Sequence, residues 1–334
     1  MNIKKHILII GCILTQCVAF AQEGIPVYSD YLADNWYLLH PSMAGASTKS
    51  TIRLTARQQW FDLEDAPNLQ TLAVQTRIGE KVGVGGILFN DQNGYFSQSG
   101  AYATFAYHLS LSGNYRTLSQ LSFGMSVGLI QSRLDESNFD LIDFDPVITG
   151  GQQSDSYMNV DLGMSYNYMD FSFHAAIKNA LPAKREIFTE GRESRNQRRF
   201  ITSLSYNISR QGSPWSFEPS VMFQGTDRTQ EATGDANLKA YRKMDWGRLW
   251  GGLSYRRSFD GAEFSSNGEA VDVQKLSYIT PFVGGNYGRF MFAYTYSYQN
   301  NSVVLTNGGF HQITIGYDFG DNREPYDCNC PAVN

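Results

Sequence analysis

Large apolar side chains alternate with small or polar ones in many stretches of the chain. Over 290–299, the sequence Phe-Met-Phe-Ala-Tyr-Thr-Tyr-Ser-Tyr-Gln places an aromatic residue at every second position, and similar splits occur over 121–129 and 159–168. Because successive side chains of a strand point to opposite faces, each stretch predicts a strand with one apolar and one polar face. A soluble β-sandwich buries its apolar face, whereas a membrane barrel turns that face to lipid around a polar lumen.

The spacing of these stretches distinguishes the two cases. The pattern predicts about fourteen strands, most of them near the length that a tilted membrane-spanning strand needs. Their ranges are 51–60, 68–78, 81–90, 95–109, 117–131, 156–168, 171–179, 199–208, 215–225, 235–244, 246–258, 275–285, 288–299 and 309–319. Links on one side, such as 79–80 and 169–170, are short, whereas 132–155, 180–198 and 259–274 on the other side are long. This sorting is typical of outer-membrane barrels, and neither a sandwich nor a propeller explains it. We therefore expect an all-β fold, a single transmembrane antiparallel β-barrel over 51–319.

The amino terminus resembles a secretory signal peptide. Lys4 and Lys5 precede an apolar run over 7–14, and Ala19-Phe20-Ala21 offers the small residues of a cleavage site. Residues 1–21 are therefore predicted to be removed, which leaves a formal charge of 25 − 32 = −7. An acidic chain without a basic stripe argues against nucleic acid as a partner. No later run of 18 apolar residues occurs, so we expect the chain to cross a membrane only as strands.

The segment 22–50 departs from the strand period. One face at helical spacing holds Tyr28, Tyr31, Leu32, Asn35 and Leu39. Ser29 or Asp30 could cap the start of the helix, and Pro41 would end it. Such a helix could pack at the periplasmic mouth or enter the lumen as a plug. A barrel of about fourteen strands is too wide for its inward side chains alone to fill, so both alternatives stay open.

The last residues, 320–334, are predicted to form a polar periplasmic tail. Its two cysteines, Cys328 and Cys330, are too few for a structural metal site, and a bridge across one residue is unfavourable. A reduced or loosely paired tail is therefore favoured.

Several short motifs near the amino terminus form a series. Tyr28-Ser29-Asp30-Tyr31 is followed by Leu39-His40-Pro41-Ser42-Met43-Ala44-Gly45, then by Arg57-Gln58-Gln59-Trp60, Ala66-Pro67 and Lys81-Val82-Gly83-Val84-Gly85-Gly86. This series resembles the signature of the PorP/SprF family, although His40 and Ser42-Met43 stand where the family usually has Asn and Ala-Tyr. The resemblance marks the following signature residues: Tyr31, Pro41, Ala44, Gly45, Arg57, Gln58, Gln59, Trp60 and Pro67.

The resemblance implies a specific role. Members of this family are outer-membrane barrels of Bacteroidetes that serve the type IX secretion system, in several cases together with gliding motility. They support export or surface retention of particular large cargo, such as adhesins with a type IX carboxy-terminal domain, and contact periplasmic components of the machine. An outer-membrane location with both termini in the periplasm is therefore expected.

Catalysis is not predicted. Gly124-Met125-Ser126-Val127-Gly128 matches the Gly-x-Ser-x-Gly motif of hydrolases, but that nucleophile needs a strand-to-helix turn and Ser126 lies within a predicted strand. Of the histidines beyond the signal peptide, His40, His108 and His311 are expected to be solvated or structurally hydrogen-bonded, and His174 to face the lumen. We expect no enzyme and no cofactor.

A diffusion porin is the alternative function. Porins commonly carry opposed charges across a constriction, and Arg53, Arg57, Asp161 and Lys178 are candidates for such a lumen. The same residues could equally form ion pairs that fill space.

Two long loops carry opposite charge. The loop 132–155 is acidic, but it lacks the ordered ligand spacing of a calcium-binding EF-hand, and the loop 180–198 is rich in arginine. Because one hairpin separates them, we expect them to lie side by side and to be positioned for a partner. The candidate contact residues are Asp140, Asp143, Asp145, Arg192, Arg195 and Arg198.

Overall fold

The computed structural model describes residues 31–59, 66–114, 116–137, 151–181, 198–227, 229–265, 271–300, 309–321, 323–328 and 330–333. The predicted signal peptide, 1–21, lies outside the described residues. No helix among these residues is long and apolar enough to cross a membrane.

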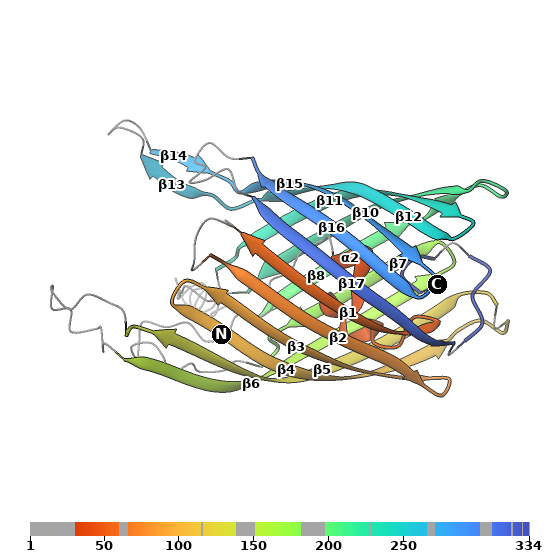
Figure 1. The fold of residues 1–334 in the computed structure, drawn as a ribbon, viewed down its shortest axis with the longest axis horizontal. Helices are drawn as coiled ribbons and strands as arrows, with labels where there is room; N and C mark the ends of the chain where they lie inside the picture. The colour runs from red at the N-terminus through yellow and green to blue at the C-terminus, as the bar shows by residue number, and fades with distance from the viewer. Residues whose placement is uncertain are drawn as a thin grey trace, which may run out of the picture.

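The strands form a closed antiparallel barrel of 14 strands, which confirms the predicted fold class (Figure 1). Each strand pairs with its neighbours in sequence, and β1 pairs with β17 to complete the ring. The strands are β1 Lys49–Gln59, β2 Asn68–Ile78, β3 Val82–Asn93, β4 Phe96–Ser110, β5 Ser119–Asp135, β6 Gln152–Tyr168, β7 Phe171–Lys178, β8 Arg199–Tyr206, β9 Ile208–Ser209, β10 Trp215–Thr226, β11 Ala232–Met244, β12 Gly247–Ser258, β15 Ser277–Tyr287, β16 Phe290–Gln299 and β17 Phe310–Asp321. The short β9 continues β8, because both pair with β10.

The barrel has apolar residues outside and polar residues inside. On the outer face, Leu129 is 70% exposed, and Phe292 is 55% exposed. On the inner face, Asn159 and Thr314 are at most 1% exposed. A soluble protein would place these groups the other way round, so the exposed apolar band is the surface that meets lipid.

The two ends of the barrel differ in their connections. The links β6–β7, β11–β12 and β15–β16 are short turns, and they lie at the end where the chain terminates, here called the short-turn end (Figure 1). The long links 136–151, 179–198 and 259–276 join strands at the opposite end, here called the loop end. Exposed aromatic residues gather near the short-turn end, as at a membrane interface: Tyr168, Tyr206, Trp215, Trp246, Tyr287 and Phe290.

Two predicted long loops contain strand. The range 132–155 was predicted as loop, but β5 and β6 continue through Arg133↔Ser154 to Asp135↔Gln152. The range 259–274 holds a hairpin of β13 Ala262–Ser265 and β14 Val271–Gln274. These additions lie at the loop end of the barrel. Beyond the membrane both faces of a strand meet water, so the apolar and polar alternation that revealed the other strands is lost.

The amino-terminal segment is helical but not one helix. It forms α2 Tyr31–Asp34, α3 Trp36–Leu39 and a 3-10 turn, η1 Pro41–Met43. Asn35 interrupts the predicted single helix with a non-helical backbone at φ −149° and ψ 67°. The reason is tertiary, because this segment is surrounded by the barrel wall and its backbone carbonyls bond to the wall, as described next.

Candidate functional site

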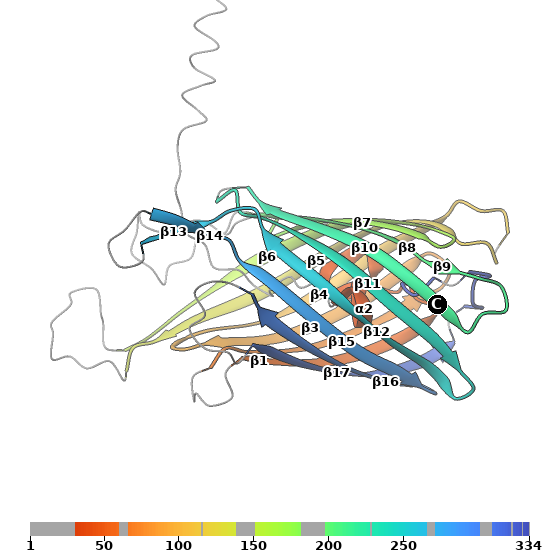
Figure 2. The same ribbon diagram turned by 90° about the horizontal axis from the view of Figure 1, so that it is seen from above.

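The amino-terminal segment lies inside the barrel (Figure 2). We call residues Tyr31–Ala46 the lumen segment. Tyr31, Tyr37 and Leu39 are at most 1% exposed. They belong to one apolar cluster with wall residues that include Ile87 and Tyr102. Of the two arrangements left open by the sequence, the structure has the segment within the lumen.

Two lysines of the wall hold the lumen segment by its backbone. Very short helices leave their carbonyl groups without intrahelical partners, and a buried carbonyl needs a donor. Lys239 Nζ donates to Leu32 O at 3.0 Å, and Lys178 Nζ donates to Leu38 O at 3.1 Å. The wall therefore supplies hydrogen bonds that the short helices lack.

Each lysine is also paired with a carboxylate. Lys178 Nζ lies 2.9 Å from Asp161 Oδ2, and Lys239 Nζ lies 3.3 Å from Glu218 Oε1. Tyr241 Oη donates to the second oxygen of Glu218 at 2.6 Å. A buried charge is tolerated when it is paired and hydrogen-bonded, and these pairs meet both conditions.

Replacing Lys239 by methionine is expected to destabilise the barrel by about 3–5 kcal/mol, because Glu218 would remain buried without its cation. The temperature at which the folded form disappears in unboiled gel samples measures this. Lys243→Met, on the same strand but exposed, is the matched control. Adding Glu218→Gln to Lys239→Met should recover part of the loss. Equal melting of Lys239→Met and the control would contradict the pairing.

Glycines of β3 make room for the lumen segment. A Cβ at Gly83 would lie 1.9 Å from Ala44 O, and one at Gly85 would lie 2.6 Å from the Tyr37 ring. Gly45 itself has φ +66°, and its N–H donates to Gln75 Oε1 at 2.9 Å. The motif 81–86 of β3 and the motif 39–45 of the lumen segment therefore pack directly against each other.

The hydrolase-like motif 124–128 lies in β5, which also makes room for the lumen segment. A Cβ at Gly124 would lie 2.3 Å from the Pro41 carbonyl carbon. Ser126 hydrogen-bonds Thr104 Oγ1 at 2.7 Å, and Thr104 accepts a hydrogen bond from Tyr37 Oη at 2.7 Å. Ser126 lies mid-strand in β5 and is buried, so it is not placed as the nucleophile of a hydrolase.

A buried serine and histidine also meet in the wall. His108 Nδ1 lies 2.8 Å from Ser122 Oγ, and its Nε2 lies 3.0 Å from Ala44 O. Because the Ala44 carbonyl can only accept, Nε2 carries the proton and Nδ1 accepts from Ser122. Ser122 is 0% exposed, so no substrate reaches it. The pair fastens the lumen segment to β4 and β5.

The other three histidines among the described residues are also hydrogen-bonded. His40 Nε2 lies 3.2 Å from Ser203 Oγ, and His174 Nε2 lies 3.1 Å from Asn167 Oδ1 within the lumen. Tyr294 Oη lies 2.7 Å from His311 Nδ1 on the outer face. His174 faces the lumen as predicted. Among the described residues, no group of three or more His, Cys, Asp or Glu could hold a metal ion.

The signature residues fall in two places. Tyr31, Pro41, Ala44 and Gly45 belong to the lumen segment and are buried. Arg57 is buried in the wall with its guanidinium 4.6 Å from the Phe310 ring centroid. Gln58, Gln59 and Pro67 lie where β1 ends and β2 begins, at the loop end of the barrel. Gln59 N donates to Pro67 O at 3.0 Å, and Gln58 pairs with His311 in register. Trp60 lies outside the described residues.

Three of the four candidate pore charges, Arg53, Asp161 and Lys178, form ion pairs. Arg57 donates to Gln312 Oε1 at 3.4 Å and to Ser297 Oγ at 3.5 Å. Arg53 Nη2 lies 2.7 Å from Asp318 Oδ1, and its Nε donates to Asp34 O at 3.2 Å. Asp161 is bound by Lys178 as described above. Arg53 and Lys178 bind both to carboxylates of the wall and to backbone carbonyls of the lumen segment. They are therefore not arranged as opposed charges across an open constriction.

The carboxy-terminal tail folds back over the short-turn end. Thr48 N donates to Val333 O at 2.9 Å, and Tyr326 Oη donates to Gln120 Oε1 at 3.4 Å. Cys330 and Val333 are at most 2% exposed and join the apolar cluster of the lumen segment. The structure joins the sulfurs of Cys328 and Cys330, whereas the sequence favoured a reduced or loosely paired tail. Both cysteines pack with the apolar cluster of the lumen segment, a contact that the sequence pattern does not reveal.

Most of the predicted contact residues in the long loops lie outside the described residues: Asp140, Asp143, Asp145, Arg192 and Arg195. Arg198 is described, and its Nε donates to Asp227 Oδ2 at 2.7 Å. This pairs Arg198 with the turn that follows β10. Whether it also meets the acidic loop stays a prediction.

Sequence reasoning missed Lys239 and Glu218. Both stand at positions where strand alternation places polar residues, and nothing in the spacing separates a buried lysine from a hydrated one. One feature of the sequence could have indicated this pair. Polar groups stand at every second position of β11, at Asp235, Asn237, Lys239 and Tyr241, and so share one face of the strand.

Comparison with known proteins gives one family. The chain matches a family model described as type IX secretion system membrane protein PorP/SprF over residues 20–317. No curated protein matches the chain in sequence.

Solved structures resemble the chain only distantly. It has 10% identity and a TM-score of 0.45 with the CymD monoaromatic hydrocarbon channel, covering 91% of this chain and 96% of that one. It has 11% identity and a TM-score of 0.37 with Salmonella typhi OmpF in complex with daunomycin, covering 81% and 97%. For the translocator domain of autotransporter NalP from Neisseria meningitidis, the identity is 10% and the TM-score 0.35, covering 81% and 87%. Likeness at this level carries no inference about function.

Proposed function

This chain belongs to the PorP/SprF family of type IX secretion system membrane proteins, and we propose that it is a non-enzymatic accessory that supports specific large cargo. The barrel and the family together indicate the outer membrane. The observation that carries the proposal is the family match over residues 20–317. In this proposal the cargo consists of adhesin-like proteins with type IX carboxy-terminal domains, including motility adhesins in a gliding cell.

The packed lumen supports an accessory role over that of a conduit. The lumen segment is attached to opposite parts of the wall, through Lys178 on β7, Lys239 on β11 and His108 on β4. Among the described residues, the buried lumen segment takes up lumen space that a cargo chain would need, which disfavours passage of cargo through this barrel. We infer that cargo is exported elsewhere in the machine and that this barrel acts beside that route. The same packing argues against a diffusion porin.

We further propose that the short-turn end faces the periplasm and that both termini lie on that side, because the long loops of outer-membrane barrels are extracellular. The lumen segment and docked tail would then face periplasmic components of the secretion system, and the long loops would face cargo at the cell surface. The predicted removal of residues 1–21 belongs to this proposal.

A deletion strain is expected to lose one or a few large adhesin-like proteins from the cell surface while most other type IX cargo still leaves the cell. Quantitative proteomics of the cell surface and culture medium measures this. Complementation with the full chain should restore the missing proteins. An unchanged surface proteome together with reduced uptake of a small solute would reject the secretion role and favour the porin.

A further inference from the structure

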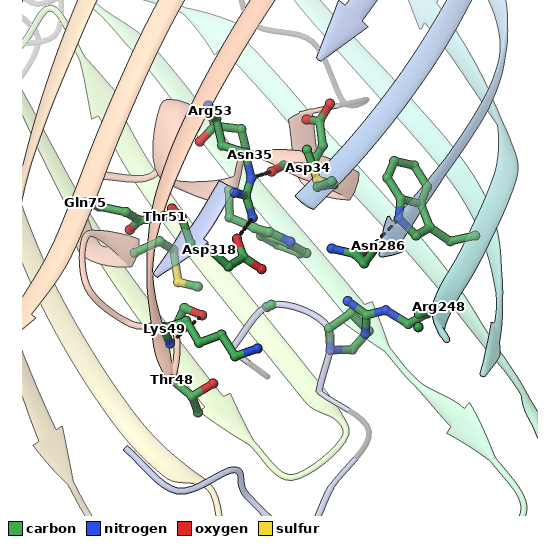
Figure 3. Close-up of a pocket in the computed structure, with 18 of the residues that line it drawn as sticks. Asp34, Asn35, Thr48, Lys49, Thr51, Arg53, Gln75, Arg248, Asn286 and Asp318 are labelled. Carbon is green, nitrogen blue, oxygen red and sulfur yellow. Dashed lines mark hydrogen bonds and ion pairs between the residues drawn. The ribbon is translucent and has the colours of Figure 1, made fainter. Parts of the chain in front are cut away.

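A cavity opens beside the lumen segment at the short-turn end of the barrel (Figure 3). Its volume is about 310 Å³, at the lower end of the roughly 300–1,000 Å³ typical of small-molecule sites. Asp34 and Trp36 of the lumen segment line it, together with Pro331 of the tail and residues of β1, β12, β15 and β17. Gly247 and Gly288, next to two short turns, also line it and place it at the mouth.

Two cations face each other across this cavity. Figure 3 shows the side chains of Lys49, from β1, and Arg248, from β12, reaching into it from opposite sides. No ion pair joins either residue to a carboxylate in the part of the chain that the structure describes. Both are half-buried, and Arg248 is positioned by the Tyr241 ring, whose centroid lies 5.3 Å from its Cζ.

A third donor is oriented by a tryptophan. Trp250 Nε1 donates to Asn286 Oδ1 at 3.3 Å. Because an indole N–H can only donate, Asn286 must present its oxygen to Trp250. Its amide nitrogen is therefore left to point away from Trp250, toward the cavity, where Figure 3 shows it.

Two acidic residues line the cavity, Asp34 and Asp318, and neither is free. Figure 3 shows the Asp34 side chain directed away from Lys49 and Arg248. Asp318 forms the ion pair with Arg53, whose guanidinium lies 2.7 Å from it. An ammonium, a guanidinium and an amide N–H₂ thus converge on one space, and the carboxylates of Asp34 and Asp318 are both engaged with other groups. Such a set of donors suits a group with several acceptor oxygens and negative charge.

We propose that this cavity binds an oxyanion, the carboxylate or phosphate group of a ligand that enters from the short-turn end. The inference goes beyond the cargo role and does not depend on it.

Titration of the purified full chain in detergent, at constant ionic strength, tests this proposal. The probes are sodium succinate, inorganic phosphate and sodium chloride, and calorimetry or tryptophan fluorescence reports binding. Saturable binding of both oxyanions supports a general oxyanion site. Binding of succinate alone assigns a carboxylate ligand, and binding of phosphate alone assigns a phosphate ligand. If neither oxyanion saturates, or chloride binds equally well, the proposal is overturned.

Substitutions locate the site. Combined Lys49→Gln and Arg248→Gln should weaken oxyanion binding by at least about tenfold, because charge-assisted hydrogen bonds are lost. Combined Lys81→Gln and Arg210→Gln removes the same charge from exposed short turns at the same end of the barrel and should leave binding unchanged. Equal weakening in both variants would assign the effect to surface charge and overturn the proposal.

Asn286→Asp tests the third donor with little change in shape. It places a carboxylate where the amide donor faces the cavity and is expected to abolish oxyanion binding, while the gel shift on boiling confirms that the barrel remains folded. Wild-type binding by this variant would overturn the proposal even if the double variant failed to fold.

Discussion

Deleting residues 31–46 is expected to turn a sealed barrel into an open channel. A barrel of about fourteen strands cannot fill its lumen with inward side chains alone. In the full chain Tyr31, Tyr37 and Leu39 occupy that space. Without them, water should enter a lumen lined by Asp161, Lys178, Glu218 and Lys239. In planar bilayers the deletion variant should conduct at least about tenfold more than the full chain, because a water-filled barrel is a porin-like pore.

Two controls define this result. Deletion of 323–333 alone removes the docked tail but keeps the lumen segment, so it should conduct little more than the full chain. Deletion of both segments should conduct at least as well as deletion of the lumen segment. A folded double-deletion barrel that did not conduct would contradict the lumen segment as the block. A full chain that already conducted as well as the deletion variant would remove the structural argument against a porin.

The outer wall of the barrel follows directly from the sequence. Lipid imposes a period of two on every spanning strand, so residues such as Phe290, Phe292 and Tyr294 could be assigned to one face. They are 50%, 55% and 41% exposed on that face. Turn lengths then distinguished the two ends of the barrel. The alternation of apolar residues and the turn lengths are both properties of short stretches of sequence. They can therefore be recognised without knowing which strands lie opposite each other across the lumen.

The lumen could not be predicted in the same way. The contacts of Tyr37 with Thr104 and of Lys239 with Leu32 join residues far apart in sequence, and they depend on barrel closure and register. Asn35 breaks the expected helix because surrounding wall contacts outweigh the helical period. The tail docks through Tyr326, Cys330 and Val333, which show no periodicity. The signature motifs indicated the family, but only the structure brings 39–45 against 81–86.

Replacing Gly83 by valine is expected to detach the lumen segment from the wall. The new Cβ would lie 1.9 Å from Ala44 O and 2.7 Å from His108 Nε2, and the backbone carbonyl cannot swing aside as a flexible side chain can. The hydrogen bond between His108 and Ala44 should therefore be lost. Valine favours strands, so any loss of function cannot be assigned to weaker strand propensity.

Gly86→Val is the matched control on the same strand. A Cβ there would have only Tyr102 O within 4 Å, at 3.8 Å, so this variant should behave as the wild type. Chymotrypsin, which cleaves after aromatic residues, should cut the lumen segment of Gly83→Val near Tyr37 faster than that of Gly86→Val. Its bilayer conductance should rise as well. If both variants resist the protease and conduct equally, the lumen segment does not depend on the β3 glycines for its place. If Gly83→Val instead prevents barrel assembly altogether, packing of the lumen segment against β3 is a condition for folding, and a compensating deletion of 31–46 should then restore assembly.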